Sequence, residues 1–235
     1  METEETVKEG LVTASKAKSI WLAFVDIVLF AVLSMIFLFL FAIPFALVFP
    51  ELKTEVGETN IYFQMLNEVL MLVSGLIAAC MVLGFRKLPF SGLGLSLKGW
   101  GRSLLRGALF VVFLYVVGFG LSLLLGAVEV VGFLFSPISL LVSLLLYFFV
   151  AVTEEVIGRG FILGRMLDGG INKFVALFIS AVLFSLMHLF NPNFAFVPFL
   201  NIMVAGCFLG ASYIYTRNLC FPIALHWFWN WIQGS

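Results

Sequence analysis

Long runs of apolar residues dominate the chain, and short polar segments separate them. An α-helix needs about 20 apolar residues to cross the hydrocarbon core of a bilayer. The pattern therefore predicts an all-α, polytopic transmembrane helical bundle of about seven spans, with room for an eighth, broken segment. The predicted spans cover approximately residues 20–48, 61–84, 107–127, 136–158, 172–190, 195–215 and 219–233.

The overall composition agrees with a membrane protein and excludes other classes. Of the 235 residues, 63% are hydrophobic and 11% are charged, whereas soluble domains are about 45–50% apolar and about 25% charged. Lipid must therefore solvate much of the apolar surface. Basic and acidic residues balance at 13 each, so no basic excess suggests a nucleic-acid partner. The three cysteines lack a ligand spacing, and we interpret them as apolar filler.

The distribution of basic residues predicts the orientation of the chain in the membrane. Residues 1–19 are polar and charged, unlike a secretory signal peptide, and we expect them to form a cytoplasmic segment. Of the 13 basic residues, 12 then fall on the cytoplasmic side, and Lys53 falls outside. This asymmetry follows the positive-inside rule. The compact chain favours a prokaryotic plasma membrane as its location.

One connecting segment, residues 93–106, has a basic face. Lys98, Arg102 and Arg106 recur at every fourth position, while leucines and Trp100 fill the opposite face. This spacing predicts an amphipathic helix that lies on the cytoplasmic leaflet. We favour an ordinary surface anchor over an element that recruits substrate.

Two adjacent carboxylates follow the apolar run that begins near residue 140. Glu155 and Arg159 are spaced i, i+4 and can pair on one helix face, which would keep Glu155 ionised and structural. Glu154 points about 100° away and is free to act as a base. A charged helix end at the membrane surface is the alternative interpretation of this motif.

A histidine in the next predicted span lies at the depth of Glu154. A tight turn is indicated at residues 168–170, with Glu154 about 16 residues before its centre and His188 about 18 residues after it. Because an α-helix rises about 1.5 Å per residue, both side chains lie roughly 25 Å from the turn. On antiparallel helices, Glu154 and His188 can therefore face each other. The alternative is a packed histidine of the core.

The last predicted span adds a second histidine and an amide. His226 and Asn230 share one helix face, and both can donate hydrogen bonds to a developing oxyanion. The chain contains two histidines, and both belong to this polar set. Asp26 and Glu68 lie near span ends, where we expect interfacial or paired carboxylates rather than catalytic ones.

The polar residues of the second half form three short motifs. They are Glu154-Glu155-x-x-x-Arg159, Phe184-x-x-x-His188 and His226-x-x-x-Asn230. Together and in this order, they resemble the signature motifs of the CAAX-protease and bacteriocin-processing family (CPBP or Abi). That family includes the Ras-converting CAAX endopeptidase, and the resemblance covers about residues 140–233. We therefore divide the chain into a cytoplasmic segment (1–19), N-terminal transmembrane helices (20–135) and a catalytic core (136–235).

The resemblance implies an intramembrane endopeptidase. It assigns activation of the attacking water to Glu154 and His188, and stabilisation of the oxyanion to His226 and Asn230. The implied substrate is a membrane-associated or lipidated, CAAX-like peptide or a prenylated protein. The alternative is a non-proteolytic membrane protein, such as an immunity protein or scaffold, that retains the motifs. The residues expected to support the reaction are Glu155, Arg159 and Phe184.

The sequence favours a hydrolase that requires no metal. No HExxH pattern is present, although catalytic zinc usually has three protein ligands. A zinc site is the alternative, and its ligands would be Glu154, His188 and His226. Using all three as ligands would leave no general base, whereas a glutamate and a histidine can activate water without a metal.

The predicted orientation has a direct test. We expect a cysteine introduced at Lys98 to react with a membrane-impermeant maleimide from the cytoplasmic side of the membrane. The reason is that the basic segment must stay on that side. Labelling of intact cells from the outside face would contradict the orientation.

Overall fold

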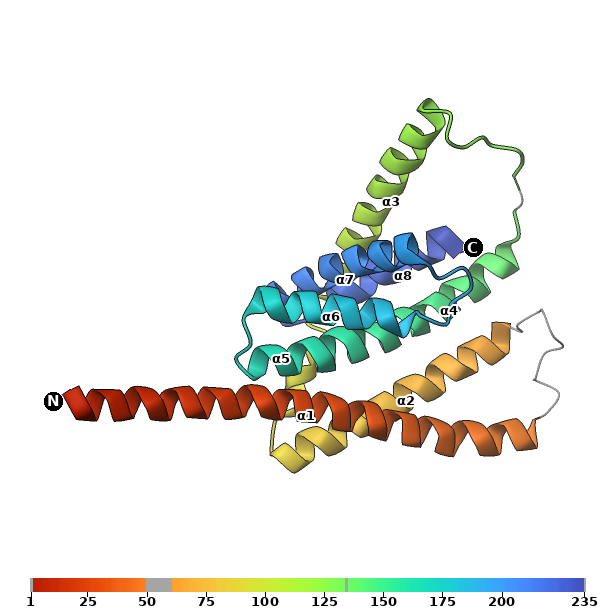
Figure 1. The fold of residues 1–235 in the computed structure, drawn as a ribbon. Coiled ribbons are helices and arrows are strands. Elements are labelled where there is room, and N and C mark those ends of the chain that lie inside the picture. The colour runs from red at the N-terminus through yellow and green to blue at the C-terminus, as the bar shows by residue number, and fades with distance from the viewer. Residues whose placement is uncertain (1, 50–60, 134, 235) are drawn as a thin grey trace.

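A computed structural model describes residues 2–49, 61–133 and 135–234, and Lys53 lies outside this part of the chain. Within the described residues the protein is helical and has no strand (Figure 1). The elements are α1 (Glu2–Val48), α2 (Ile61–Arg86), η2 (Phe90–Leu93), α3 (Trp100–Leu124), α4 (Pro137–Glu155), η3 (Val156–Leu163), α5 (Gly164–Asp168), α6 (Lys173–Met187), α7 (Phe196–Thr216) and α8 (Cys220–Gly234).

The prediction of a polytopic helical bundle is confirmed, but its helices differ in length. In the described residues, five helices are long and apolar enough to cross a membrane. The helices α6 and α8, which occupy the predicted spans 172–190 and 219–233, have 15 residues each. At about 1.5 Å per residue they reach ~22 Å. The five long segments are Ser15–Val48, Ile61–Arg86, Trp100–Leu124, Pro137–Asp168 and Phe196–Thr216.

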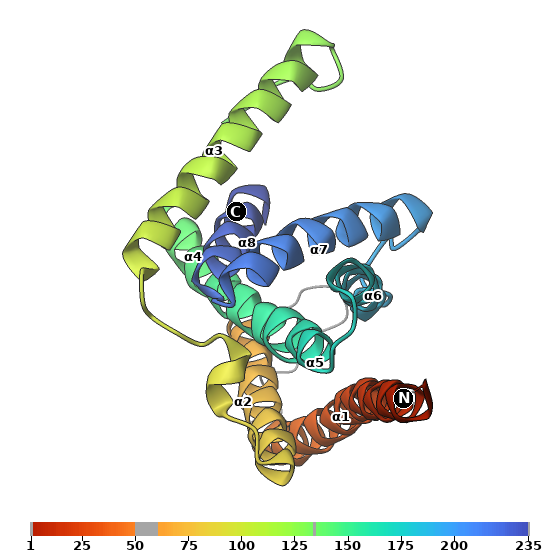
Figure 2. The ribbon, with the colours of Figure 1, turned by 90° about the vertical axis from the view of Figure 1, so that its left-hand side faces the viewer.

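The helices pack around the segment formed by α4, η3 and α5. The pair α1 and α2 lies on one side of it, while α6, α7 and α8 lie on the other (Figure 1). Figure 2 shows α3 leaning away from the rest and meeting the bundle at α8. The close approach of α3 to α8 depends on Gly107, because a Cβ at this position would lie 2.8 Å from the Cβ of Ala224.

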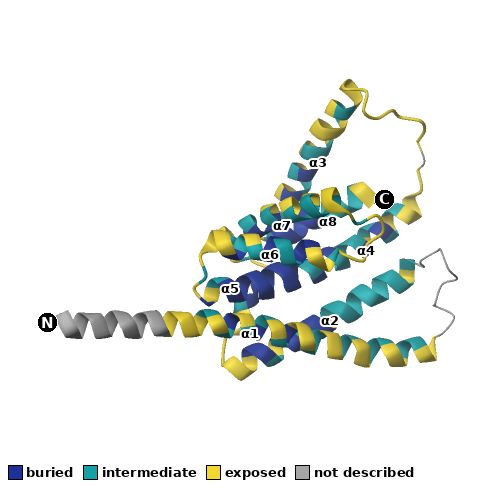
Figure 3. Cartoon of the chain, viewed as in Figure 1, coloured by how far each residue is buried: buried dark blue, intermediate teal, exposed yellow. Residues whose placement is uncertain are grey.

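Burial follows the same arrangement. Figure 3 shows the buried residues concentrated along η3, α5 and the helix faces that meet them, with exposed residues on the outer faces. Many exposed side chains are large and apolar, among them Leu109, Phe113 and Leu141. Such outward-facing apolar surface is what lipid contact requires. The core of the protein is therefore narrow and centred on the segment that carries the two adjacent glutamates.

This central segment is one continuous helix with a π-helical stretch inside it. The N–H of Gly164 donates to the carbonyl of Arg159, five residues earlier, and every residue of η3 is buried. A π-helical turn holds an extra residue, and such turns occur frequently at functional sites. The sequence pattern placed the end of this span near residue 158, whereas the helix continues to Asp168.

Glycine allows the chain to pack tightly against the π-helical stretch. A Cβ on Gly160 would lie 2.9 Å from the carbonyl oxygen of Leu93, at the end of η2. The hydroxyl of Ser180 donates to the carbonyl of Gly158 at 3.3 Å. Backbone groups that a regular helix would bond in another pattern are thus partly satisfied by neighbouring elements.

The predicted amphipathic helix at 93–106 is wrong. Residues 94–99 are not helical, and α3 begins at Trp100. Gly94 and Gly99 have positive φ angles of 72° and 79°, which are left-handed conformations that interrupt a helix. Lys98 precedes α3, whereas Arg102 and Arg106 lie within it, so the three basic residues do not share one helix face.

A network of charges joins the N-terminal helix pair to the central segment. The carboxylate of Asp26 on α1 is 0% exposed and binds Arg86 at 2.6 Å and Arg165 at 2.8 Å. Asp168 lies 3.1 Å from Arg217 and 3.9 Å from Arg165. The expectation that Asp26 is a paired carboxylate is therefore confirmed.

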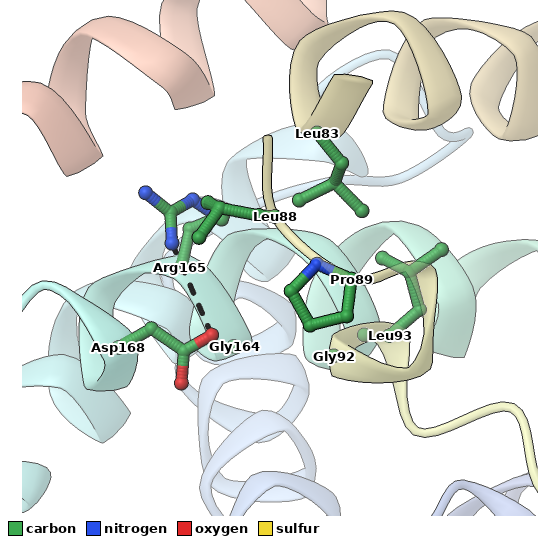
Figure 4. Close-up of a pocket in the computed structure, with 9 residues that line it drawn as sticks. Leu83, Leu88, Pro89, Gly92, Leu93, Gly164, Arg165 and Asp168 are labelled. Atoms are coloured by element: carbon green, nitrogen blue, oxygen red, sulfur yellow. Dashed lines mark ion pairs between the residues drawn. The ribbon is translucent and has the colours of Figure 1, made fainter. Parts of the chain in front are cut away.

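A small hollow lies beside this network, between η2 and the central segment. Figure 4 shows Leu88, Pro89 and Leu93 on one side of it, with Arg165 and Asp168 on the other. Its volume is about 40 Å³, which suffices for a few water molecules but not for a peptide. The chemistry of the motifs must therefore be sought at the other polar cluster.

Candidate active site

A fully buried ion pair forms the base of the second polar cluster. The side chain of Glu155 is 0% exposed and that of Arg159 is 1% exposed, and Nη1 of the arginine donates to Oε1 of the glutamate at 2.9 Å. Nη2 of Arg159 donates to the carbonyl oxygen of Gly206 on α7 at 3.3 Å. The predicted pairing of Glu155 with Arg159 is confirmed, and the alternative of a charged helix end at the surface is wrong for this pair.

The same carboxylate orients a histidine from the last helix. Nδ1 of His226 lies 2.8 Å from Oε1 of Glu155. The oxygen of Glu155 that accepts from Arg159 also accepts here, so Nδ1 of His226 carries a proton and donates it. One glutamate oxygen thus receives bonds from both Arg159 and His226, which links the central segment to α8.

Phe184 covers the buried guanidinium. The Cζ atom of Arg159 lies 4.0 Å from the centroid of the Phe184 ring, a distance suited to a cation–π contact. The same ring meets His188 edge to face at 4.9 Å and His226 at 6.1 Å between centroids. Phe184 therefore packs over the guanidinium of Arg159 and contacts both imidazoles of the site.

Glu154 faces both histidines, in agreement with the depth argument. Its Oε2 atom lies 3.6 Å from Nε2 of His188 and 3.8 Å from Nε2 of His226. Both distances exceed those of a direct hydrogen bond. The Oε2 atom is buried and has no hydrogen-bond partner among the described residues. Side chains from α4, the end of α6 and α8 thus converge on one carboxylate oxygen.

The hydrogen bond at Nδ1 of each imidazole determines whether its Nε2 atom, which faces Glu154, accepts or donates. Nδ1 of His188 lies 2.8 Å from the carbonyl oxygen of Phe184, which accepts and cannot donate. In a neutral ring with its proton on Nδ1, Nε2 of His188 is an acceptor, whereas Nε2 of His226 accepts in the neutral ring and donates in the doubly protonated ring. Nε2 of His188 and Oε2 of Glu154 therefore present two acceptors that lie 3.6 Å apart. A donor such as a water molecule would satisfy them.

Asn230 lies one helical turn after His226 on α8 and is half-buried. Within the described part of the chain, its side chain makes no hydrogen bond to another residue. Its amide is thus free to donate to a ligand. Unlike the histidines, Asn230 makes no ion pair or hydrogen bond with Glu154 in this structure.

Glu68 on α2 lies next to the segment that carries Glu154. The hydroxyl of Thr153 donates to the main-chain oxygen of Glu68 at 3.2 Å, so α2 lies against α4 next to Glu154. The Oε2 atom of Glu68 is buried and has no hydrogen-bond partner among the described residues. An ionisable side chain inside an apolar span is a signal of function. From its position near a span end we expected Glu68 to be interfacial or paired, and that expectation stays a prediction.

The candidate zinc ligands named above were Glu154, His188 and His226. Among residues 15–49, 61–133 and 135–234, no group of three or more His, Cys, Asp or Glu side chains is arranged to hold a metal ion. The two histidine Nε2 atoms nevertheless lie 3.6 and 3.8 Å from one oxygen of Glu154.

The buried ion pair predicts a large effect of Arg159→Ala on stability. Removing one partner of a buried pair leaves the other charge uncompensated, at a cost of about 3–5 kcal/mol. We expect a clearly lower thermal unfolding midpoint and a lower monodisperse yield in detergent. Arg217→Ala is the matched control, because that arginine is 45% exposed and pairs at the surface. Equal midpoints for the two variants would show that the buried pair is dispensable.

Comparison with known proteins finds one family model that matches these residues. Residues 136–232, from the start of α4 into α8, match the sequence model of a family described as type II CAAX prenyl endopeptidase Rce1-like. No curated protein and no solved structure matches the chain. The matched segment contains the buried ion pair, both histidines, Glu154 and Asn230. The family model that matches residues 136–232 thus agrees with the CAAX-protease family that the three motifs resemble.

Proposed function

We propose that this protein is an intramembrane endopeptidase that hydrolyses a peptide bond in a membrane-associated substrate, with Glu154 and His188 activating the water. The family supports endopeptidase activity at a coarse level. The observation that carries the finer proposal is the convergence of Glu154, His188 and His226 on one buried oxygen. This arrangement can activate water, stabilise the oxyanion and hold the reacting groups in place.

The first step is activation of water. A water molecule that donates one hydrogen bond to Oε2 of Glu154 and one to Nε2 of His188 keeps its lone pairs free for attack. Glu154 accepts a proton from the water as the oxygen attacks the carbonyl carbon of the scissile bond. The acceptor state of His188 follows from its Nδ1, which lies against the Phe184 carbonyl. The proton then passes to the amine that leaves when the C–N bond breaks.

The second step is stabilisation of the oxyanion, which we assign to His226 and Asn230. The amide of Asn230 can donate without rearrangement of a competing bond. For Nε2 of His226 to donate while Nδ1 donates to Glu155, the ring must be doubly protonated. The buried carboxylate of Glu155 supplies the opposite charge next to that ring. Donors fixed before the reaction stabilise developing charge without reorganisation.

The third element is support of the reacting groups. Arg159 holds the Glu155 carboxylate, and Glu155 holds the His226 ring in one orientation. Phe184 contacts Arg159 and both imidazoles. Groups that fix reacting side chains contribute to rate because small misplacements are costly. We therefore propose Glu155, Arg159 and Phe184 as positioning residues.

We propose a lipidated or membrane-associated, CAAX-like peptide or a prenylated protein as the substrate. The family model supports this class, and the site lies among helices with apolar outer faces. A peptide tethered to the bilayer by a lipid would reach such a site without leaving the membrane. The proposed location is a prokaryotic plasma membrane, with the N-terminus in the cytoplasm.

The proposal predicts that Glu154→Gln abolishes cleavage and leaves folding intact. Removal of a general base typically lowers the rate by about 10²–10⁴-fold. The assay incubates purified protein in lipid vesicles with lipidated peptides and maps the products by mass spectrometry. Glu129→Gln, which changes an exposed carboxylate in the connector between α3 and α4, is the matched control. Full activity of Glu154→Gln would contradict the mechanism. If the wild type cleaved none of the peptides, a non-proteolytic role would be favoured.

The proposal also predicts that cleavage needs no bound metal. Elemental analysis of active, purified protein should give less than one metal ion per chain, and chelation should leave the rate unchanged. Stoichiometric zinc whose removal abolishes cleavage and whose return restores it would overturn this prediction. Glu154, His188 and His226 would then be the zinc ligands, and zinc would supply a Lewis acid and an activated water.

A further inference from the structure

Two tryptophans of α8 donate hydrogen bonds to the backbone of α4. The indole N–H of Trp227 donates to the carbonyl oxygen of Leu144 at 2.8 Å, and that of Trp231 donates to the carbonyl oxygen of Leu140 at 3.0 Å. The two donors lie about one helical turn apart, and so do the two acceptors. The two bonds therefore join the helix that carries Asn230 to the helix that carries the adjacent glutamates.

Each of these tryptophans directly follows a residue of the proposed oxyanion site. Trp227 follows His226, and Trp231 follows Asn230. Successive side chains of an α-helix point about 100° apart, so one residue can bind a neighbouring helix while the residue before it faces the site. The two indoles can thus hold α8 in place without occupying the site.

The hydrogen bonds from α8 reach separate places along α4. His226 binds Glu155 at the end of α4, whereas the indoles bind the carbonyls of Leu144 and Leu140, which lie 11 and 15 residues earlier. At about 1.5 Å per residue, the outermost two contacts are ~22 Å apart along α4. The bond to Glu155 leaves the later turns of α8 without a polar anchor on α4. The indole bonds supply that anchor in the part of α8 that carries Asn230.

The position of Asn230 depends on the placement of its helix. The imidazole of His226 is oriented directly by Glu155, whereas the side chain of Asn230 makes no hydrogen bond to another residue in the described part of the chain. Its amide can donate to a developing oxyanion when the backbone of α8 has the correct rotation and register. A displacement of about 1 Å can lower a rate about 10²-fold. Anchors on both sides of Asn230 prevent such a displacement.

A third tryptophan of α8 shows that an indole on this helix does not require an acceptor. Trp229 packs against Tyr115 of α3, with 5.0 Å between the ring centroids, and is 39% exposed. Among the described residues, its indole N–H donates to none. Hydrogen bonding to α4 is thus specific to the two tryptophans that adjoin His226 and Asn230.

We propose that Trp227 and Trp231 are positioning residues of the hydrolytic reaction, which hold Asn230 where its amide donates to the oxyanion. The inference rests on the proposed function, in which Asn230 is an oxyanion donor. Donors that are fixed before the reaction stabilise developing charge without reorganisation. Loss of the indole bonds leaves Asn230 present but misplaced, which weakens binding of the transition state and not of the substrate.

The test removes the two indole N–H groups and keeps aromatic rings in their place. In lipid vesicles with a lipidated peptide, we expect the double variant Trp227→Phe/Trp231→Phe to lower kcat about tenfold, with KM within about twofold of the wild type. Trp229→Phe, the same change on the same helix, is the matched control and should keep wild-type kinetics. Asn230→Ala should lower kcat about 10²–10³-fold. In a chain with Asn230→Ala, adding the double change should lower kcat less than about twofold further, because the indoles act through Asn230.

Wild-type kcat in the double variant overturns the inference, and so does a rise in KM at constant kcat. A further loss of about tenfold in the Asn230→Ala chain overturns it as well, because the indoles would then act independently of Asn230. An equal loss in Trp229→Phe would indicate a general effect of packing and would also overturn it. If the double variant is not monodisperse, Trp231→Phe alone is compared with Trp229→Phe, with an expected loss of about threefold. Full activity of Asn230→Ala overturns the inference together with the oxyanion donor, whereas failure of the proposed water activation is recognised separately, by full activity of Glu154→Gln.

Discussion

A fully buried ion pair between Glu155 and Arg159 is the interaction on which the catalytic half of the molecule depends. Charged side chains within an apolar bundle are expensive and persist when they are paired and hydrogen-bonded. Here the pair recruits its remaining bonds from other helices: the carbonyl of Gly206 on α7 and the ring of His226 on α8. Satisfying one pair therefore fixes three helices relative to one another.

Two adjacent carboxylates at the end of α4 have different surroundings, because successive side chains of a helix point about 100° apart. Glu155 points into the core toward Arg159, while Glu154 points toward the two Nε2 atoms. The helix continues past them to Asp168 because its irregular hydrogen bonds are buried under η2 and α6. Gly160 permits this cover, since a side chain there would meet the backbone at Leu93. The π-helical stretch and the polar residues of the candidate site thus lie in one continuous helical segment.

Much of the fold could be predicted because apolar runs determine where helices lie. The expected spans 61–84 and 195–215 correspond to Ile61–Arg86 and Phe196–Thr216. The facing of Glu154 and His188 followed from helix rise and one glycine turn. The prediction of a helix at 93–106 was wrong, because hydrophobic periodicity does not show which glycines adopt a positive φ angle. Gly94, for example, lies against Tyr213 and the backbone of Arg217.

The residues that sequence reasoning could not assign depend on contacts between distant segments. Nothing local distinguishes Glu68 from Asp26, yet the backbone of Glu68 contacts Thr153 beside Glu154, whereas Asp26 lies between two arginines. The orientation of each imidazole likewise depends on partners far away in sequence or on a specific carbonyl. The catalytic roles of Glu154, His188, His226 and Asn230 stay predictions until activity is measured.

The most direct test of the central claim, that Glu154 activates water rather than attacking the peptide itself, follows oxygen through one turnover. Excess protein in lipid vesicles is transferred to ¹⁸O-labelled water and mixed with a lipidated peptide, and the products of the first turnover are weighed by mass spectrometry. The account predicts cleavage at one peptide bond, with a single ¹⁸O atom in the new carboxylate of every product molecule. A first-turnover product without ¹⁸O would show that an oxygen of the protein had attacked and would contradict the account.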